Sequence, residues 1–190
     1  MIQRSAAVTR HAPTRKSAFI LLPVVTRISD STILARVRSE LDIKNVFSST
    51  LQDYREDTWL DDFGYKVNYN ADYLLDMAFT QNGLAAYPDT HEKHILISLR
   101  DGKLVKAADV FDVTKLEALA ALAGGALQIE LAKLRAENLA DVRDNDERQA
   151  LTDAYSNLKF ERENLDEFSV GQTEITFLYD AGFPPCDQGA

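Results

Sequence analysis

The regular alternation of apolar and polar residues between Tyr65 and Phe79 constrains the fold of this chain more than any other feature of its sequence. The first half alternates tyrosine and valine with lysine and asparagine. A break follows at Asn70–Asp72, and large apolar residues then recur at every second position from Tyr73. A period of two residues is typical of strands that bury one face. The stretch therefore predicts two adjacent strands.

Two dipeptides predict where strands of this region turn. Asn82–Gly83 and Asp101–Gly102 both combine residues that adopt positive φ at low cost, as tight hairpin turns require. The runs His94–Leu99 and Lys103–Val105 supply further strand candidates around them. Gly64 to about Lys106 thus predicts a four-stranded antiparallel meander.

Upstream of the meander, the sequence predicts a strand, a helix and another strand. Ala18–Ile28 is apolar, and Pro23 within it marks a bulge or a sheet edge. Asp30–Thr32 is a cluster of N-capping residues that introduces helical spacing over Thr32–Asp42. The aromatic and apolar residues of Phe47–Trp59 favour another strand that pairs with the meander.

Downstream, the spacing changes to that of helices. Apolar residues follow a 3.6-residue period from Val113 to Leu134, and Gly124–Gly125 within this run predicts a kink or a break, since each glycine costs about 1 kcal/mol there. A shorter helix is predicted over Leu151–Leu158, and alternation returns in Phe168–Val170 and Ile175–Tyr179. This order predicts an α+β fold, with an antiparallel sheet meander packed against helices.

The length of the chain suits one domain. We expect a flexible segment over residues 1–16 and a single α+β domain over 17–183. Within it, 17–63 form the strand and helix opening and 64–183 the meander, helices and final strands. An irregular tail follows over 184–190, which is rich in proline and glycine.

The net charge of −9 argues against nucleic acid and anionic membrane surfaces as partners. It fits either solubility or a basic protein partner. No apolar run reaches the ~20 residues that span a bilayer, and the basic N-terminus lacks the apolar segment of a signal peptide. We expect no transmembrane segment and no signal peptide in this chain. The single cysteine, Cys186, leaves the cellular compartment open, and the sequence also leaves the oligomeric state open.

His91 and His94 form an H-x-x-H pair, with Asp89 nearby. Histidines at this spacing in a loop can contribute two metal ligands, but the ligand set is incomplete, because Asp89 is the only candidate third ligand nearby. We therefore expect no metal, no cofactor and no catalytic residue. A metal-dependent hydrolase that uses this loop remains an alternative.

Several segments resemble a known family. The run from Tyr65 to Leu75, the turn Gly83–Pro88, and the stretch from Gly102-Lys103 to Asp109-Val110-Phe111 look like the domain of unknown function in RsiV-type anti-sigma factors and PdaC-type peptidoglycan deacetylases. The ending FSVGQTEITFLYDAGF is similar to the closing element of that family. Tyr87 stands where the family turn often has a histidine, and this departure makes the turn the place to look for a ligand.

This resemblance implies a bacterial, non-catalytic binding or sensing module. It also implies an extracytoplasmic location near the cell envelope and a partner such as lysozyme or an envelope component. The alternative from another class is a stand-alone cytosolic protein with an unknown partner. Our candidate ligand-binding residues surround the turn and the aromatic strand that precedes it: Tyr69, Tyr87, Pro88, Asp89, His91 and His94.

Overall fold

The computed structural model describes residues 2–9, 18–56, 60–84, 88–140 and 142–181. The chain divides into two compact units, whereas the sequence predicted one domain over 17–183. The first unit contains residues 1–105 and 168–176, and the second contains 106–167 and 177–190. The helices of the chain and its mostly antiparallel strands confirm the predicted α+β class.

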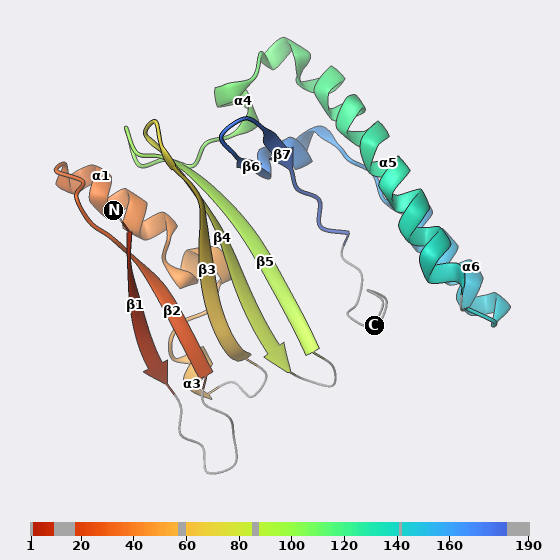
Figure 1. Ribbon diagram of the computed structural model, residues 1–190, viewed down its shortest axis with the longest axis horizontal. Coiled ribbons are helices and arrows are strands. Elements are labelled where there is room, and N and C mark those ends of the chain that lie inside the picture. The colour runs from red at the N-terminus through yellow and green to blue at the C-terminus, as the bar shows by residue number, and fades with distance from the viewer. Residues whose placement is uncertain (1, 10–17, 57–59, 85–87, 141, 182–190) are drawn as a thin grey trace. The chain divides into compact units, whose positions relative to one another are not determined.

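The first unit is built on a five-stranded sheet in the order β1-β2-β3-β4-β5 (Figure 1). Its strands are β1 Ile2–Thr9, β2 Ala18–Val25, β3 Leu60–Ala71, β4 Leu74–Leu84 and β5 Pro88–Ser98. Neighbours pair antiparallel except β2 and β3, which are parallel over Phe19 and Ile20. Because β1 pairs with β2 along its length, residues 2–9 belong to the sheet rather than to the flexible segment predicted over 1–16.

Three short helices connect β2 to β3 and cover one face of the sheet. They are α1 Ser31–Glu40, α2 Ile43–Phe47 and α3 Asp53–Glu56. The Asp30 carboxylate caps α1 by accepting from the amides of Thr32 and Ile33, as the N-cap cluster predicted. The strand predicted over Phe47–Trp59 is wrong where the chain is described, because that segment contributes the end of α2 and the whole of α3; Trp59 lies outside the described residues.

Helices and sheet together bury the core of the first unit. Val37, Leu41, Val46 and Tyr54 from the helical segment pack with side chains that alternate along the strands. The strand contribution consists of Ile20, Val25, Leu60, Phe63, Leu75, Met77, Phe79 and Ile97. The aromatic alternation in the sequence therefore marks a buried face, as predicted.

Of the two predicted turns, the structure contains the one at Asp101–Gly102 but not the one at Asn82–Gly83. Asn82 and Gly83 lie inside β4, paired with Thr90 and Asp89, so the turn predicted there is wrong. β3 and β4 are joined at the break after Asn70, where Asp72 and Tyr73 take positive φ. The turn at Asp101–Gly102 is confirmed: the Gly102 amide donates to the Ser98 carbonyl, and Gly102 has φ 75°. A fourth strand was predicted after this turn, over Lys103–Val105. In the structure this segment forms one isolated β-bridge, between Leu104 and Ile97.

The second unit is helical, with α4 Ala107–Val110, the 3-10 turn η1 Val113–Lys115, α5 Leu116–Ala140, α6 Asn145–Asn157 and the 3-10 turn η2 Arg162–Asp166. Its core joins Ala107, Leu116, Ala120 and Leu165. α5 continues through Gly124 and Gly125, so the break predicted there does not occur. The alternation predicted after Phe168 forms the strands β6 Phe168–Val170 and β7 Ile175–Phe177, which pair as a hairpin around Gly171; residues 168–176 of it belong to the first unit.

Candidate functional site

A buried carboxylate lies on the face of the sheet opposite the helices. Asp76 stands between Leu75 and Met77 in β4, and the alternation of the strand directs it away from the core that those two residues enter. Its side chain is fully buried. A carboxylate in this position requires hydrogen-bond donors, because burying an unsatisfied charged group is very costly.

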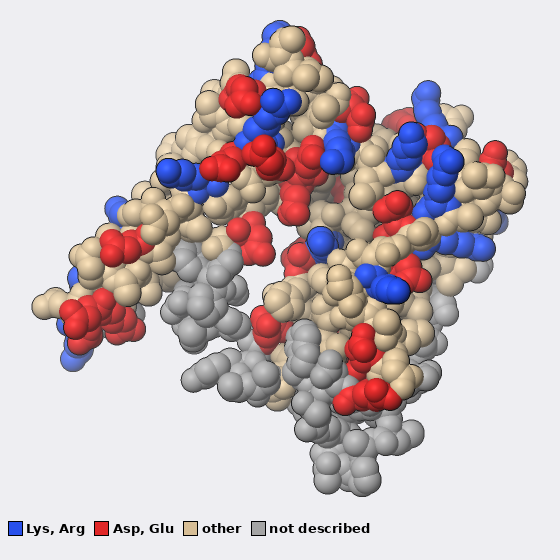
Figure 2. All heavy atoms as spheres, turned by 180° about the vertical axis from the view of Figure 1, so that it is seen from behind, with Lys and Arg blue, Asp and Glu red and all other residues tan. Residues whose placement is uncertain are grey.

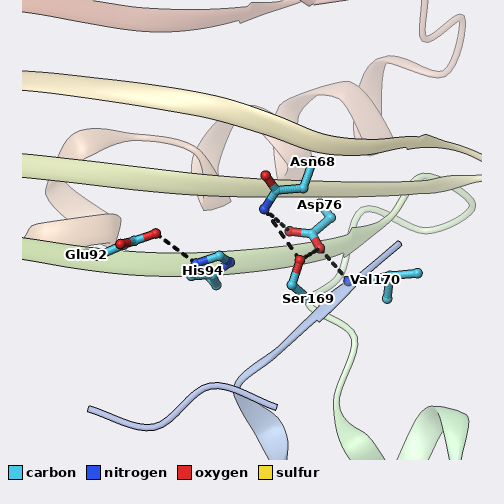
Figure 3. A network of polar contacts seen from close by, with 6 residues as sticks. All are labelled: Asn68, Asp76, Glu92, His94, Ser169 and Val170. Carbon is cyan, nitrogen blue, oxygen red and sulfur yellow. Dashed lines mark hydrogen bonds and ion pairs between the residues drawn. The ribbon is translucent and has the colours of Figure 1, made fainter. Parts of the chain in front are cut away.

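The donors come from β6 and from β3 (Figure 3). The Ser169 hydroxyl and the Val170 amide both donate to Asp76 Oδ2 at 2.6 Å. The Asn68 amide group approaches Asp76 Oδ1 at 3.5 Å and Ser169 Oγ at 3.4 Å. We call Asn68, Asp76, Ser169 and Val170 the Asp76 cluster. It fastens the C-terminal hairpin to the meander, which is a structural role.

His94 lies on the same face as Asp76, two residue pairs further along the β4–β5 ladder. It pairs with Ala78, and its Nε2 lies 3.0 Å from Glu92 Oε1 (Figure 3). The His94 side chain is 15% exposed, and its Nδ1 is buried with no partner among the described residues. His94 is thus oriented by Glu92, which is itself 57% exposed.

His91 lies on the other face of β5, because an i, i+3 pair in a strand points to opposite sides. Its Nε2 contacts Asp89 Oδ2 at 2.9 Å, and both side chains are exposed. The sequence placed His91 in a loop that leads into a strand beginning at His94; the structure places both histidines inside β5. The two histidines therefore cannot share one metal ion. Among the described residues, no group of three or more His, Cys, Asp or Glu side chains could hold a metal.

The predicted ligand residues do not form one site. Tyr69 lies near the β3–β4 turn, where its hydroxyl donates to Asp72 Oδ2 at 2.5 Å, and this hydrogen bond raises the pKa of Tyr69. Asp89 pairs with Gly83 at the other end of β4, about 20 Å away at 3.3 Å per residue. Pro88 is the first residue of β5, and Tyr87 lies outside the described residues.

A pocket of about 640 Å³ lies elsewhere in the first unit. Its walls come from β2, from the end of α1, from α2 and from the segment before α3. The lining is apolar at Leu22, Pro23, Val24, Val25, Leu41, Ile43 and Leu51, and polar at Arg38, Asp42, Lys44, Thr50 and Gln52. This volume is typical of small-molecule sites, which are mostly apolar with a few polar groups.

Hydrogen bonds hold the Arg38 and Asp42 side chains of this pocket. Arg38 Nη2 donates to the Val25 carbonyl at 3.2 Å, which fixes the guanidinium beside β2. The Asp42 carboxylate caps α2 by accepting from the Lys44 amide at 2.9 Å. Two cationic side chains and one carboxylate thus meet an apolar wall. Sequence reasoning missed this pocket because its residues come from separate elements and no motif links them.

No family model matches this chain, and no curated protein matches it. Two crystal structures of DUF3298 family proteins have a similar fold. One, from Bacteroides fragilis, has a TM-score of 0.62 and 14% identity, and the match covers 100% of this chain and 87% of that one. The other, from Pseudomonas aeruginosa PAO1, has a TM-score of 0.52 and 12% identity, with 92% and 80% covered. At such identities the likeness establishes a shared fold.

Within the described ranges, no helix is both long enough and apolar enough to cross a membrane. On the face drawn in Figure 2, Lys and Arg side chains are interspersed with Asp and Glu rather than gathered into one basic area.

Proposed function

We propose that this protein is a non-catalytic binding module of the RsiV- and PdaC-like kind that recognises a cell-envelope ligand. The observation that carries the proposal is the pocket beside β2, which offers an apolar wall and two cations to a ligand. The similar fold of the DUF3298 proteins and the motifs between Tyr65 and Phe111 support it.

The chemistry of the pocket favours a ligand that joins a carboxylate to an apolar group. Arg38 offers a planar set of donors that suits carboxylates, and Lys44 adds a second positive charge. The apolar wall, which includes Leu22, Leu41 and Ile43, would cover aliphatic atoms next to that carboxylate. Soluble peptidoglycan fragments carry peptide carboxylates on aliphatic residues and therefore suit this pocket.

Calorimetric titration with soluble peptidoglycan fragments tests this proposal. We expect binding in the parent protein and at least a tenfold loss of affinity in Arg38→Ala and Lys44→Ala. Lys159→Ala removes the same charge from an exposed position of the second unit and should bind like the parent. The absence of heat at millimolar fragment, or equal binding by all variants, would reject the pocket as the site.

The net charge of −9 favours a second candidate ligand, a basic protein such as lysozyme. The net charge supports this candidate, and the pocket does not. Lysozyme binding should therefore respond differently to salt and to Lys44→Ala than binding in the pocket. Binding to lysozyme should weaken steeply between 50 and 300 mM salt, because screening shortens the range of charge attraction. It should also survive Lys44→Ala, since removing a cation increases attraction to a basic partner. No association at low salt would exclude lysozyme.

A further inference from the structure

The edge of β2 that faces away from β1 has no neighbouring strand along its C-terminal half. In the described part of the chain, β2 pairs with β3 at Phe19 and Ile20 alone, and the two strands diverge beyond that point (Figure 1). β1 pairs with the other edge of β2 as far as Val25. A strand edge without a neighbour presents backbone N–H and C=O groups that can pair with another chain.

The pocket beside β2 runs along this edge. Four consecutive residues of the strand, Leu22 to Val25, line it. Successive side chains of a strand point to opposite faces of the sheet, so a space that all four residues touch lies at the edge of the strand rather than over one face. At 3.3 Å per residue, this edge is about 10 Å long, which suits two or three residues of an extended peptide.

Pro23 shows which backbone groups face the pocket. It belongs to the β1–β2 ladder, although proline has no N–H to donate. Hydrogen-bonded and non-hydrogen-bonded pairs alternate along an antiparallel ladder, so Leu22 and Val24 make the hydrogen bonds to β1, and the backbone groups of Pro23 and Val25 point away from it. The hydrogen bond from Arg38 Nη2 to the Val25 carbonyl agrees with this orientation, because Arg38 also lines the pocket.

Two of these groups are available to a ligand: the Pro23 carbonyl and the Val25 amide. Among the residues that the structure describes, none donates to this carbonyl and none accepts from this amide. Val25 is 4% exposed, and a buried amide without an acceptor is costly. An acceptor on a bound ligand would remove this cost.

The same two groups determine the direction of an added strand. In a parallel pair, a residue opposite Val24 donates to the carbonyl of Pro23 and accepts from the amide of Val25. An antiparallel partner would instead exchange both hydrogen bonds with Pro23 or with Val25. Pro23 has no amide hydrogen, and the Val25 carbonyl already accepts from Arg38. The edge is therefore built for a parallel strand.

We propose that this edge binds the C-terminal residue of a short peptide as an added parallel strand, an inference that rests on the proposed function of the pocket as a ligand site. The last residue of the peptide lies opposite Val24. Its N–H donates to the Pro23 carbonyl, and its free carboxylate accepts from the Val25 amide and from Arg38. The site thus recognises an acylated α-amino acid rather than any aliphatic carboxylate.

The charges of the pocket favour a carboxylate at this point. Arg38 is held beside Val25 by its own hydrogen bond, and its remaining N–H groups suit a carboxylate. Lys44 adds a second positive charge, and the Asp42 carboxylate already accepts from the Lys44 amide. Neither Arg38 nor Lys44 forms an ion pair with another described residue. One positive charge in excess therefore remains for the ligand.

Calorimetric titration with matched peptides tests the recognition of the last residue. The probe is N-acetyl-Ala-Ala-Leu with either an L or a D leucine. Its C-terminal amide lacks the negative charge, and its analogue methylated on the last peptide nitrogen lacks the N–H. We expect at least one free acid to bind, and each modification to weaken its binding about tenfold or more. The proposal is overturned if either modified peptide binds as well as the free acid, or if neither free acid binds at millimolar concentration.

Arg38→Gln tests the partner of the carboxylate. This variant should lose most of the preference for the free acid over the amide, a ratio that is measured within one variant and does not depend on its stability. Arg36→Gln is the matched control, because Arg36 also lies on α1 and donates to a backbone carbonyl, that of Asp101, but does not line the pocket. It should keep the preference of the parent. An unchanged preference in Arg38→Gln would refute the assignment of Arg38.

Peptidoglycan fragments in the same titrations separate this inference from the proposed function. Fragments that bind while both free acids fail would support the proposed function and refute the strand pairing. Free acids that bind through Arg38 while fragments fail would support the strand pairing and exclude peptidoglycan as the ligand.

Discussion

Ser169 donates its hydroxyl hydrogen to Asp76 Oδ2 at 2.6 Å, which joins residues 93 positions apart in the chain. The adjacent amide of Val170 donates to the same oxygen at 2.6 Å. Because Asp76 is fully buried, these donors replace the water that the carboxylate loses on folding. The Asp76 cluster therefore makes the C-terminal hairpin part of the first unit.

Asp76→Ala should destabilise the first unit strongly, since it leaves the Ser169 hydroxyl and the Val170 amide without an acceptor. Each buried unsatisfied donor costs roughly 1–3 kcal/mol. Ser169→Ala should cost about 1 kcal/mol, and the double variant should be less destabilised than the sum of the two. Denaturant unfolding measures all three variants. Strict additivity would mean that the two side chains act independently.

Gly102→Ala should destabilise the turn after β5 by about 1–3 kcal/mol. Gly102 has φ 75°, and an added Cβ would lie 2.8 Å from Arg36 Cβ and 3.0 Å from the Ile33 carbonyl oxygen of α1. Gly64→Ala is the matched control, because no atom lies within 4 Å of its Cβ position. Thermal melts should show a loss for Gly102→Ala and an equal or higher melting temperature for Gly64→Ala. Equal melting temperatures for the two variants would contradict the close approach to α1.

Tyr54 should make the protein less stable at alkaline pH. Burial, and next the charge of Asp62, raise the pKa of the Tyr54 phenol above its ordinary value. The folded state therefore holds this proton more tightly than the unfolded state. Its stabilising contribution is complete below pH ~10 and is lost as pH rises above that value, by up to about 1.4 kcal/mol per pH unit.

Comparison with Tyr54→Phe isolates this effect from the titration of lysines. The stability of the parent relative to Tyr54→Phe should fall between pH 9 and 11, as urea unfolding at each pH would measure. Tyr73→Phe changes a 63% exposed tyrosine and should keep the pH dependence of the parent. Parallel pH profiles for the parent and Tyr54→Phe would show that Tyr54 does not titrate abnormally.

Gly124→Ala should stabilise the second unit by about 1 kcal/mol. Alanine is the better helix former, and the new Cβ would make ordinary contacts with Phe160 at 3.6 and 3.7 Å. Denaturant unfolding followed by circular dichroism at 222 nm, where α5 and α6 contribute, would measure the gain. A lower stability would show that the chain at Phe160 cannot accept even a methyl group.

The contrast between the two predicted glycine turns shows what local sequence can decide. Asp101–Gly102 turns as predicted, but Asn82–Gly83 continues β4. The Asn82 side chain donates to Asp62 Oδ1 at 2.6 Å and accepts from the Thr90 hydroxyl at 2.8 Å, so it links three strands. These partners are 20 and 8 residues away. Long-range pairing therefore overrides a strong local turn preference.

In the β3–β4 turn, long-range contacts stabilise a turn instead of overriding one. Asp72 and Tyr73 both take positive φ, which is unusual for tyrosine. The Tyr73 carbonyl accepts from the Leu99 amide at 2.7 Å, and the Arg100 guanidinium lies over the Tyr73 ring at 4.8 Å. Contacts from beyond β5 thus stabilise a turn that the sequence marked only as a break.

By itself the sequence determined the elements whose signal is local: the alternating strands around Tyr65–Phe79, the capped helix after Asp30, the turn at Gly102, the helices after Val113 and the α+β class. Only the tertiary structure decided which side chains meet. It brought Ser169 to Asp76, separated His91 from His94, and formed the pocket between β2 and the α1–α2 segment. Periodicity and capping depend on neighbours within a few residues, whereas a buried carboxylate or a pocket depends on segments that only folding brings together.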